Sequence, residues 1–418
     1  MSFEMTGIRP AEILLPASGV PAETWACVAC DQYTSEPSYW RQVEALTGSA
    51  PSAARLILPE CWLRDSAERI PRIHQAMADA LKSGVLSPAV RNGFVLCERT
   101  VASGPRLGLV CALDLEAYSF EADALPLIRP TEQTIASRLP PRLAIRRGAP
   151  VELTHIMILI DDPERTVLEP LRAKAGSLRS LYDFDLMMNG GHLAGWAVES
   201  AEDLGHVNRA LNALREKLGD HPMLLAVGDG NHSLATAKAY WEEIRGNLSP
   251  HEREVHPARF ALAEIVNIHD PALLFEPIHR IVTGTSLETL MADWKQDAAE
   301  RGMTLAGAGE GHSFTVISGS QEEPVTILNP EGAIPCETLQ KYLDRFLARH
   351  PEAGIDYIHG ADSLRTLARQ PGSVGFLLPE IDKHSFFRDV QTLGVLPRKT
   401  FSMGEANEKR YYMEAKKI

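Results

Sequence analysis

The stretch MLLAVGDGNHSLATAKAY, residues 223–240, limits the fold strongly, because an apolar run meets a helical pattern through one short glycine turn. Glycine permits positive φ and close approach of a ligand, and the amides of the first helical turn point into such a connection. A helix N-terminus also carries a partial positive charge that attracts anions. The stretch predicts a strand, a turn and a helix, and the turn is either a phosphate site or a plain connection.

Strand-like and helical patterns alternate along the rest of the chain and predict an α/β fold with a mixed sheet and α+β character. Expected strands are 93–98, 106–117, 152–162, 180–188, 192–200, 223–227, 259–270, 312–318, 324–330, 355–360 and 373–380. Expected helices are 68–81, 164–176, 201–219, 231–245, 286–302 and 336–350. An Asn-Gly-Gly turn at 189–191 joins two of the strands and predicts a β-hairpin.

The length of 418 residues exceeds what one hydrophobic core usually supports, so more than one domain is expected. After Thr283 the pattern becomes a compact alternation of helices and short strands. The predicted division is an N-terminal and central region over 1–280, which contains the glycine turn, and a C-terminal α/β unit over 281–418.

The balance of 42 basic and 55 acidic residues, a net charge of −13, disfavours nucleic acid and anionic membranes as partners. No run approaches the roughly 18 apolar residues of a membrane-spanning helix, and the start shows no signal-peptide core, so a cytoplasmic location is expected. The sequence is compatible with a homo-oligomer. Cys27 and Cys30 form a CxxC pair without the further ligands that structural zinc requires, which favours ordinary reduced thiols.

Five residues of the glycine turn are candidates for binding. Gly228 and Gly230 permit the tight backbone, and Asn231 is the expected N-cap of the helix. His232 could donate a hydrogen bond to a phosphate, and Asp229 could hold Mg²⁺ or a substrate hydroxyl. Asp229 and His232 could also ligate a catalytic metal, but the spacing of the other histidines does not group them with this pair. A metal-dependent hydrolase is therefore a minor alternative.

Carboxylates near basic or hydroxyl side chains form a second set of candidates. Asp31 and Glu36 lie in CDQYTSEPSYW, and Glu132 lies close to Arg129 in RPTEQT. A carboxylate beside an arginine is most often an ion pair, whereas near a phosphate site the two could act as general base and charge stabiliser.

Basic residues late in the chain form a third set. His279 and Arg280 follow the apolar part of LLFEPIHRIV and suggest an anion pocket. Lys399 lies in GVLPRKTFSM, where a basic pair near a chain end is usually solvated and carries little weight alone.

Six segments in order resemble a bacterial and archaeal family of unknown function: CDQYTSEP, RPTEQT, DGNHSLATA, FEPIHRIV, YIHG and LPRKTF. The signature of that family is an Asp-Gly-His-His-Arg turn that opens a helix, with a Pro-Thr-His-Arg strand end and a C-terminal Pro-Lys-Ser-Thr-x-Phe segment. Its turn is similar to that of the ParB/sulfiredoxin fold, which binds nucleotide phosphates and on which ADP-dependent free-serine kinases are built. The resemblance implies a ParB/sulfiredoxin-like core followed by a C-terminal α/β unit.

The resemblance also implies nucleotide-dependent phosphoryl transfer to a small, amino-acid-like molecule, with ATP or ADP and Mg²⁺ as cofactors. The amides of 230–233 would hold phosphates, and charge would be stabilised by His232, Arg280 and Arg129, with further support from His279 and Lys399. One of Asp31, Glu36 and Glu132 would activate the substrate hydroxyl. The alternative is a non-catalytic nucleotide- or ligand-responsive regulator or interaction module.

Two positions of the turn depart from the family signature. Asn231 replaces its first histidine, and Ser233 stands where the signature has arginine. The second change removes a guanidinium that could bind phosphate through two parallel hydrogen bonds. Any phosphate site at this turn would have to take its positive charge from another part of the chain.

Overall fold

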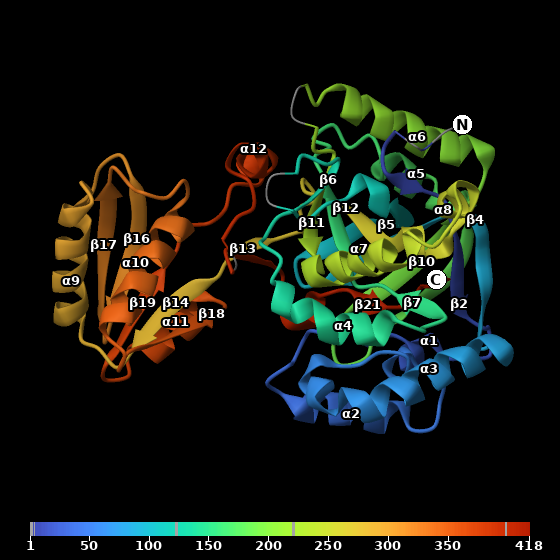
Figure 1. The fold of residues 1–418 in the computed structure, drawn as a ribbon, viewed down its shortest axis with the longest axis horizontal. Helices are drawn as coiled ribbons and strands as arrows, with labels where there is room; N and C mark the ends of the chain where they lie inside the picture. Colours follow the sequence, from blue (N-terminus) through green and yellow to red (C-terminus); the bar gives the residue numbers. More distant parts are fainter. Residues whose placement is uncertain (1–2, 4, 122–123, 220–221, 398) are drawn as a thin grey trace. The chain divides into compact units, whose positions relative to one another are not determined.

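The computed structural model describes residues 3, 5–121, 124–219, 222–397 and 399–418. The chain forms two compact units, Met1–Leu274 together with Gly404–Ile418, and Phe275–Met403 (Figure 1). The sequence predicts a division near residue 280 and a C-terminal unit that runs to residue 418. The structure differs at the C-terminus, because the last segment returns to the first unit and pairs with its strands.

The first unit carries a mixed sheet, which confirms the expected α/β class (Figure 1). Its strands follow the order β6-β11-β8-β12-β5-β4-β2-β22-β7, with β1, β9 and β10 paired off this path. Strand β11 runs parallel to β6 and antiparallel to β8. The bounds are β1 Ile8–Arg9, β2 Ala11–Pro16, β4 Leu86–Val101, β5 Gly104–Asp114, β6 Ile128–Pro130, β7 Val151–Leu153, β8 Met157–Ile160, β9 Arg179–Asp185, β10 His192–Val198, β11 Leu225–Asp229, β12 Phe260–Asn267 and β22 Ala415–Lys417.

Helices cover both faces of this sheet, because its strands are apolar on both sides. One core contains Val227 of β11 with Leu211 of α6 and Trp241 of α7. The other contains Val110 of β5 with aromatic residues of α1 and α2. The helices of the unit are α1 Ala22–Trp25, α2 Pro37–Thr47, α3 Ser66–Lys82, α4 Leu139–Arg146, α5 Glu169–Ala173, α6 Ala201–Glu216, α7 Asn231–Arg245 and α8 Pro250–Val255. The ParB/sulfiredoxin likeness of this unit stays a prediction.

The predicted hairpin is confirmed, since β9 and β10 pair antiparallel. The predicted helix over 164–176 is wrong in its first part, because α5 begins only at Glu169. The Asp162 carboxylate accepts hydrogen bonds from the amides of Thr166 at 2.6 Å and Val167 at 2.9 Å, and Arg165 has φ 54°. An aspartate that satisfies these amides stabilises a turn where the helix pattern would otherwise begin.

The second unit is built on a six-stranded sheet with the order β15-β17-β16-β19-β14-β18. Trp294 of α9 stacks on Tyr342 of α10 in its core, with ring centroids 4.7 Å apart. The bounds are β13 Phe275–Pro277, β14 His279–Thr283, α9 Leu287–Glu300, β15 Thr304–Ala306, β16 His312–Ser318, β17 Gln321–Leu328, α10 Pro335–Arg349, β18 Gly354–Ile358, α11 Ala361–Ala368, β19 Ser373–Leu377, α12 Lys383–Leu393 and β20 Phe401–Met403. No helix in the described ranges is long and apolar enough to cross a membrane.

The returning C-terminal segment is buried inside the first unit. Strand β21, Tyr411–Tyr412, pairs with β3, Cys27–Val28, and β22 pairs with β2 and β7. The Arg410 guanidinium lies 2.6 Å from the Glu264 carboxylate and 2.7 Å from that of Glu414. It also donates to the carbonyl of Thr154 at 2.7 Å. These buried charges tie the last residues of the chain to β12 and to the segment before β8.

We expect Arg410→Met to lower the free energy of unfolding by roughly 3–5 kcal/mol, because it leaves two buried carboxylates without their cation. Lys417→Met is the matched control in the same segment, since Lys417 is exposed and its pair with Glu12 should contribute within about 1 kcal/mol. Urea denaturation followed by tryptophan fluorescence measures both. Equal stability of the two variants would contradict a structural role for the buried network.

Candidate functional site

The glycine turn joins β11 to α7 and is shaped by Gly230. This residue is the N-cap of α7 and has φ 77°, in the left-handed region. A Cβ at this position would lie 3.0 Å from the Cα of Ile156 and 3.2 Å from its Cγ1. A larger residue would therefore meet both backbone strain and a clash. Gly228 lies two residues before Gly230, where the pairing of β11 with β8 shifts register.

The predicted N-cap, Asn231, is instead the first residue of α7, because the left-handed Gly230 takes the capping position itself. The Gly230 carbonyl accepts from the amides of Ser233 and Leu234, both at 3.0 Å, and its own amide donates to the Asp229 carboxylate at 2.8 Å. The amides of Asn231 and His232 have no acceptor within the helix, as at any helix start. They are the groups of this turn that can meet an anion.

His232 presents a neutral imidazole at the start of α7. Burial, reinforced by Arg138 and Arg142, lowers the pKa of His232 to about 4. Its Nε2 accepts a hydrogen bond from the amide of Ile135 at 3.2 Å. A neutral imidazole that accepts at Nε2 carries its proton at Nδ1, so His232 offers a donor there.

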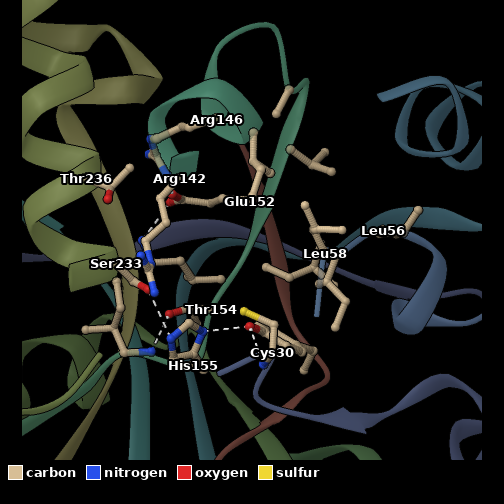
Figure 2. A pocket seen from close by; sticks show the side chains of 18 of the residues that line it. Cys30, Leu56, Leu58, Arg142, Arg146, Glu152, Thr154, His155, Ser233 and Thr236 are labelled. Atoms are coloured by element: carbon tan, nitrogen blue, oxygen red, sulfur yellow. Dashed lines mark hydrogen bonds and ion pairs between the residues drawn. The ribbon is translucent and has the colours of Figure 1, made fainter. Parts of the chain in front are cut away.

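Three side chains from distant segments form a hydrogen-bonded chain beside the turn, and two of them, His155 and Ser233, are labelled in Figure 2. Tyr412 Oη lies 2.6 Å from Nδ1 of His155, and Ser233 Oγ lies 3.0 Å from Nε2 of the same ring. The amide of Cys30 donates to Tyr412 Oη at 3.2 Å. Burial raises the pKa of Tyr412 far above its usual value, so the phenol keeps its proton.

The phenol fixes the tautomer of the histidine. Because Tyr412 Oη already accepts the Cys30 amide and remains protonated, it donates its own proton to Nδ1 of His155. His155 then carries its proton on Nε2 and donates it towards Ser233 Oγ. Nε2 is therefore a hydrogen-bond donor and cannot remove a proton from Ser233. The arrangement suits donation to an anion and disfavours a serine nucleophile with a histidine base.

Asp31 adds a carboxylate to the same place. Its Oδ2 lies 3.9 Å from Nε2 of His155, and its Oδ1 accepts from the Gln32 amide group at 3.1 Å. Burial alone would raise the pKa of Asp31, but His155, Gln32 and Lys409 outweigh it and lower the pKa below the usual value. Lys409 Nζ also lies 3.5 Å from the Asp229 carboxylate. An ionised carboxylate thus lies beside the helix N-terminus.

Positive charge reaches the turn from α4. Arg142 forms an ion pair with Glu60 and donates to the carbonyl of Arg138 at 2.7 Å. Figure 2 shows its side chain extending from α4 towards Ser233. The guanidinium therefore approaches the position where the family signature carries arginine.

Arg129 lies in β6, opposite Ala226 of the neighbouring strand β11. It is only 6% exposed, and its Nη2 has no hydrogen-bond partner among the described residues. Its Nε donates to the carbonyl of Pro126 at 3.3 Å, and burial lowers its pKa. Glu132 follows in the same segment and is half-buried.

The remaining predicted residues lie in other surroundings. Glu36 is exposed at the N-cap of α2. His279 and Arg280 belong to the second unit, where His279 Nδ1 accepts from the Leu378 amide at 3.2 Å. Arg280 is fully buried and donates to the carbonyl of Ile278 and to Cys336 Sγ.

Lys399 also belongs to the second unit and has φ 60°. The described parts of the chain hold no group of three His, Cys, Asp or Glu side chains placed to bind a metal. Cys27 and Cys30 are unbridged, and burial raises the pKa of Cys30 to about 12.

The low pKa of His232 predicts a distinctive titration. Because the folded-state pKa lies below the ordinary value of about 6.5, the neutral form is favoured, and its contribution to stability is complete above that pH and is lost as pH falls towards 4. NMR titration of the ring C–H should give a midpoint near 4 for His232. His192 is the internal control, since Asp185 and Asp183 raise its pKa. A midpoint for His232 at or above 6.5 would contradict the buried placement.

Comparison with known proteins places the chain in a family. A free serine kinase in complex with AMP aligns at 11% identity over 69% of this chain and 88% of that one, with a TM-score of 0.38. A conserved hypothetical protein from Pyrococcus furiosus aligns at 10% identity, covering 70% and 91%, with a TM-score of 0.34. SbnI with a C-terminal truncation, from Staphylococcus aureus, aligns at 10% identity, covering 71% and 83%, with a TM-score of 0.36. No curated protein matches. A family model matches residues 8–346, and the chain belongs to that family, described as Protein of unknown function (DUF1015).

Proposed function

We propose that this protein binds a nucleotide through its phosphates at residues 229–233 and transfers a phosphoryl group to a small molecule that carries a hydroxyl. One observation carries the proposal: the ionised Asp31, the Nε2–H of His155 and the N-terminus of α7 meet at one place. Phosphoryl transfer requires positioned positive charge for the phosphates and a carboxylate for the attacking hydroxyl. Both are present around Ser233.

The phosphates would lie against the amides of Asn231 and His232. The partial positive charge of the helix N-terminus and the close backbone at Gly230 favour an anion at this point. His232 adds an Nδ1–H donor for the phosphates. Because its imidazole is neutral, the ring does not need an ion pair with a carboxylate. Arg142, which approaches Ser233 from α4, supplies positive charge that the signature arginine would otherwise bring.

The substrate hydroxyl would lose its proton to Asp31. This carboxylate is ionised, and the closest ring nitrogen of His155 is 3.9 Å away, so its oxygens remain available to a substrate hydroxyl. Mg²⁺ commonly binds one or two protein carboxylates together with substrate phosphates. Asp229 fits the role of such a carboxylate, although Lys409 lies 3.5 Å from it and would have to share it.

A regulator that binds a nucleotide without converting it is the second candidate. The contact between Lys409 and Asp229 favours it, because an ammonium group at this distance competes with a metal ion for the carboxylate. Both candidates place the phosphates at the same turn. They differ only in whether bound nucleotide is consumed.

Gly230→Val should abolish nucleotide binding, because the new side chain meets Ile156 at 3.0–3.2 Å and distorts the turn. Gly84→Val is the matched control: Gly84 has φ +76°, but a Cβ there would have nothing within 4 Å, so the backbone strain is alike and the turn is untouched. Calorimetry with ATP and with ADP, each with Mg²⁺, measures binding. Wild-type affinity in Gly230→Val would show that the phosphates bind elsewhere.

Asp31→Asn should slow phosphoryl transfer by about 10²–10⁴-fold, the usual contribution of a general base, while nucleotide affinity changes little. Glu36→Gln is the matched control, because Glu36 is an exposed carboxylate of the same segment. The assay follows nucleotide conversion with pooled amino acids and hydroxy acids. Loss in Glu36→Gln but not in Asp31→Asn would reassign the base, and a wild type that binds nucleotide without converting it would indicate the regulator.

A further inference from the structure

A cavity of about 140 Å³ lies beside the glycine turn, between α3, α4, α7 and β7 (Figure 2). Its wall is mainly apolar. The apolar side chains that limit the size and polarity of a ligand include Leu56, Leu58, Met77, Ile145, Val151 and Leu262. An apolar cavity of about 150 Å³ can hold a molecule the size of benzene, so a ligand of roughly six to eight non-hydrogen atoms fits here.

Polar side chains interrupt this wall on two sides, in addition to the Arg142–Glu60 ion pair that also lines the cavity. Figure 2 shows His155 and Ser233 on one side and Arg146 with Glu152 on the other. The first pair belongs to the candidate phosphoryl-transfer site. The second pair lies on α4 and β7 and has no role in the proposed phosphoryl transfer.

The charges around Glu152 do not balance. Arg146 Nη1 lies 2.6 Å from Glu152 Oε2, and Lys416 Nζ lies 3.7 Å from Glu152 Oε1. One carboxylate is therefore shared by two cations, and its Oε1 also accepts the Leu262 amide at 2.7 Å. By contrast, Arg142 on the same helix has Glu60 to itself.

Arg146 also keeps unused hydrogen-bond donors. Its Nε and Nη2 are buried and have no hydrogen-bond partner in the described structure. Its side chain is 12% exposed. Buried donors without an acceptor cost free energy, and a bound anion would satisfy them. One excess positive charge and two neighbouring nitrogens with open N–H donors match a single carboxylate.

We infer that the cavity is the acceptor pocket for a small apolar monocarboxylate that carries a hydroxyl group. Arg146 binds the carboxylate, the apolar wall holds the carbon chain, and the hydroxyl lies at the side of His155 and Ser233. This inference rests on the proposed phosphoryl transfer for the role of the hydroxyl. The largely apolar wall favours an acceptor with a hydrocarbon chain over one as polar as free serine.

The reaction balances with these groups alone. The acceptor oxygen attacks the terminal phosphorus of the nucleotide, and its proton passes to the Asp31 carboxylate. A new P–O bond forms as the bond to the leaving phosphate oxygen breaks, and the shortened nucleotide keeps that electron pair. The products are the phosphorylated hydroxy acid and a nucleotide with one phosphate fewer.

Binding of 3-methylbutanoate to the full chain, measured by calorimetry, tests the pocket without requiring nucleotide. We expect the acid to bind at least tenfold more tightly than 3-methylbutan-1-ol, which has the same carbon skeleton and no charge. Arg146→Gln should remove that preference, and Arg146→Lys, which keeps the charge, should retain part of it. Arg147→Gln is the matched control, since Arg147 is exposed and pairs with Glu243. Equal binding of acid and alcohol, or an unchanged preference in Arg146→Gln, would overturn the inference.

A second measurement separates the pocket from the nucleotide site. The affinity for 3-methylbutanoate should be unchanged at saturating ATP with Mg²⁺, and 3-hydroxy-3-methylbutanoate should be phosphorylated. Competition between the acid and ATP would overturn the inference, because the cavity would then hold part of the nucleotide. Binding of the acid without any binding of nucleotide would support the carboxylate site and contradict the proposed function. Binding of nucleotide without binding of the acid would support the nucleotide site and overturn the inference of an acceptor pocket.

Discussion

The hydrogen bond between Tyr412 and His155 joins the C-terminal segment to the middle of the first unit, at the point where the proposed chemistry would take place. Strand β21 can deliver Tyr412 only because the C-terminal segment returns and Arg410 anchors it to Glu264 and Glu414. The phenol then fixes the proton of His155 on Nε2, facing Ser233 and Asp31. The C-terminal segment therefore stabilises the first unit and also sets which nitrogen of His155 carries the proton.

The parts of this arrangement that are local in sequence are predictable from it. The strand, glycine turn and helix at 223–240 and the hairpin over 180–200 follow from patterns a few residues long, and the structure contains both. The helix over 164–176 is shorter than predicted, because the side chain of Asp162 captures two amides that a helix would use. A competing side-chain hydrogen bond of this kind is invisible to apolar periodicity.

The site itself depends on contacts between residues far apart in the chain. His155 and Tyr412 are separated by 257 positions, and no spacing pattern connects them. Among the predicted carboxylates, Asp31 lies beside the turn and Glu36 does not, although both occur in one short segment. The path of the chain after β3 determines which of the two carboxylates reaches the turn, and the local sequence does not reveal that path. The sequence also gives no sign that Lys409 lies near Asp229, because the return of the C-terminal segment places it there.

A crystal structure of the protein with ADP is the most direct test of whether the turn at 229–233 holds nucleotide phosphates. We expect electron density for a phosphate within hydrogen-bond distance of the amides of Asn231 and His232, with Arg142 close to it. A diphosphate bound elsewhere in the chain, with this turn unchanged, would contradict the proposed site.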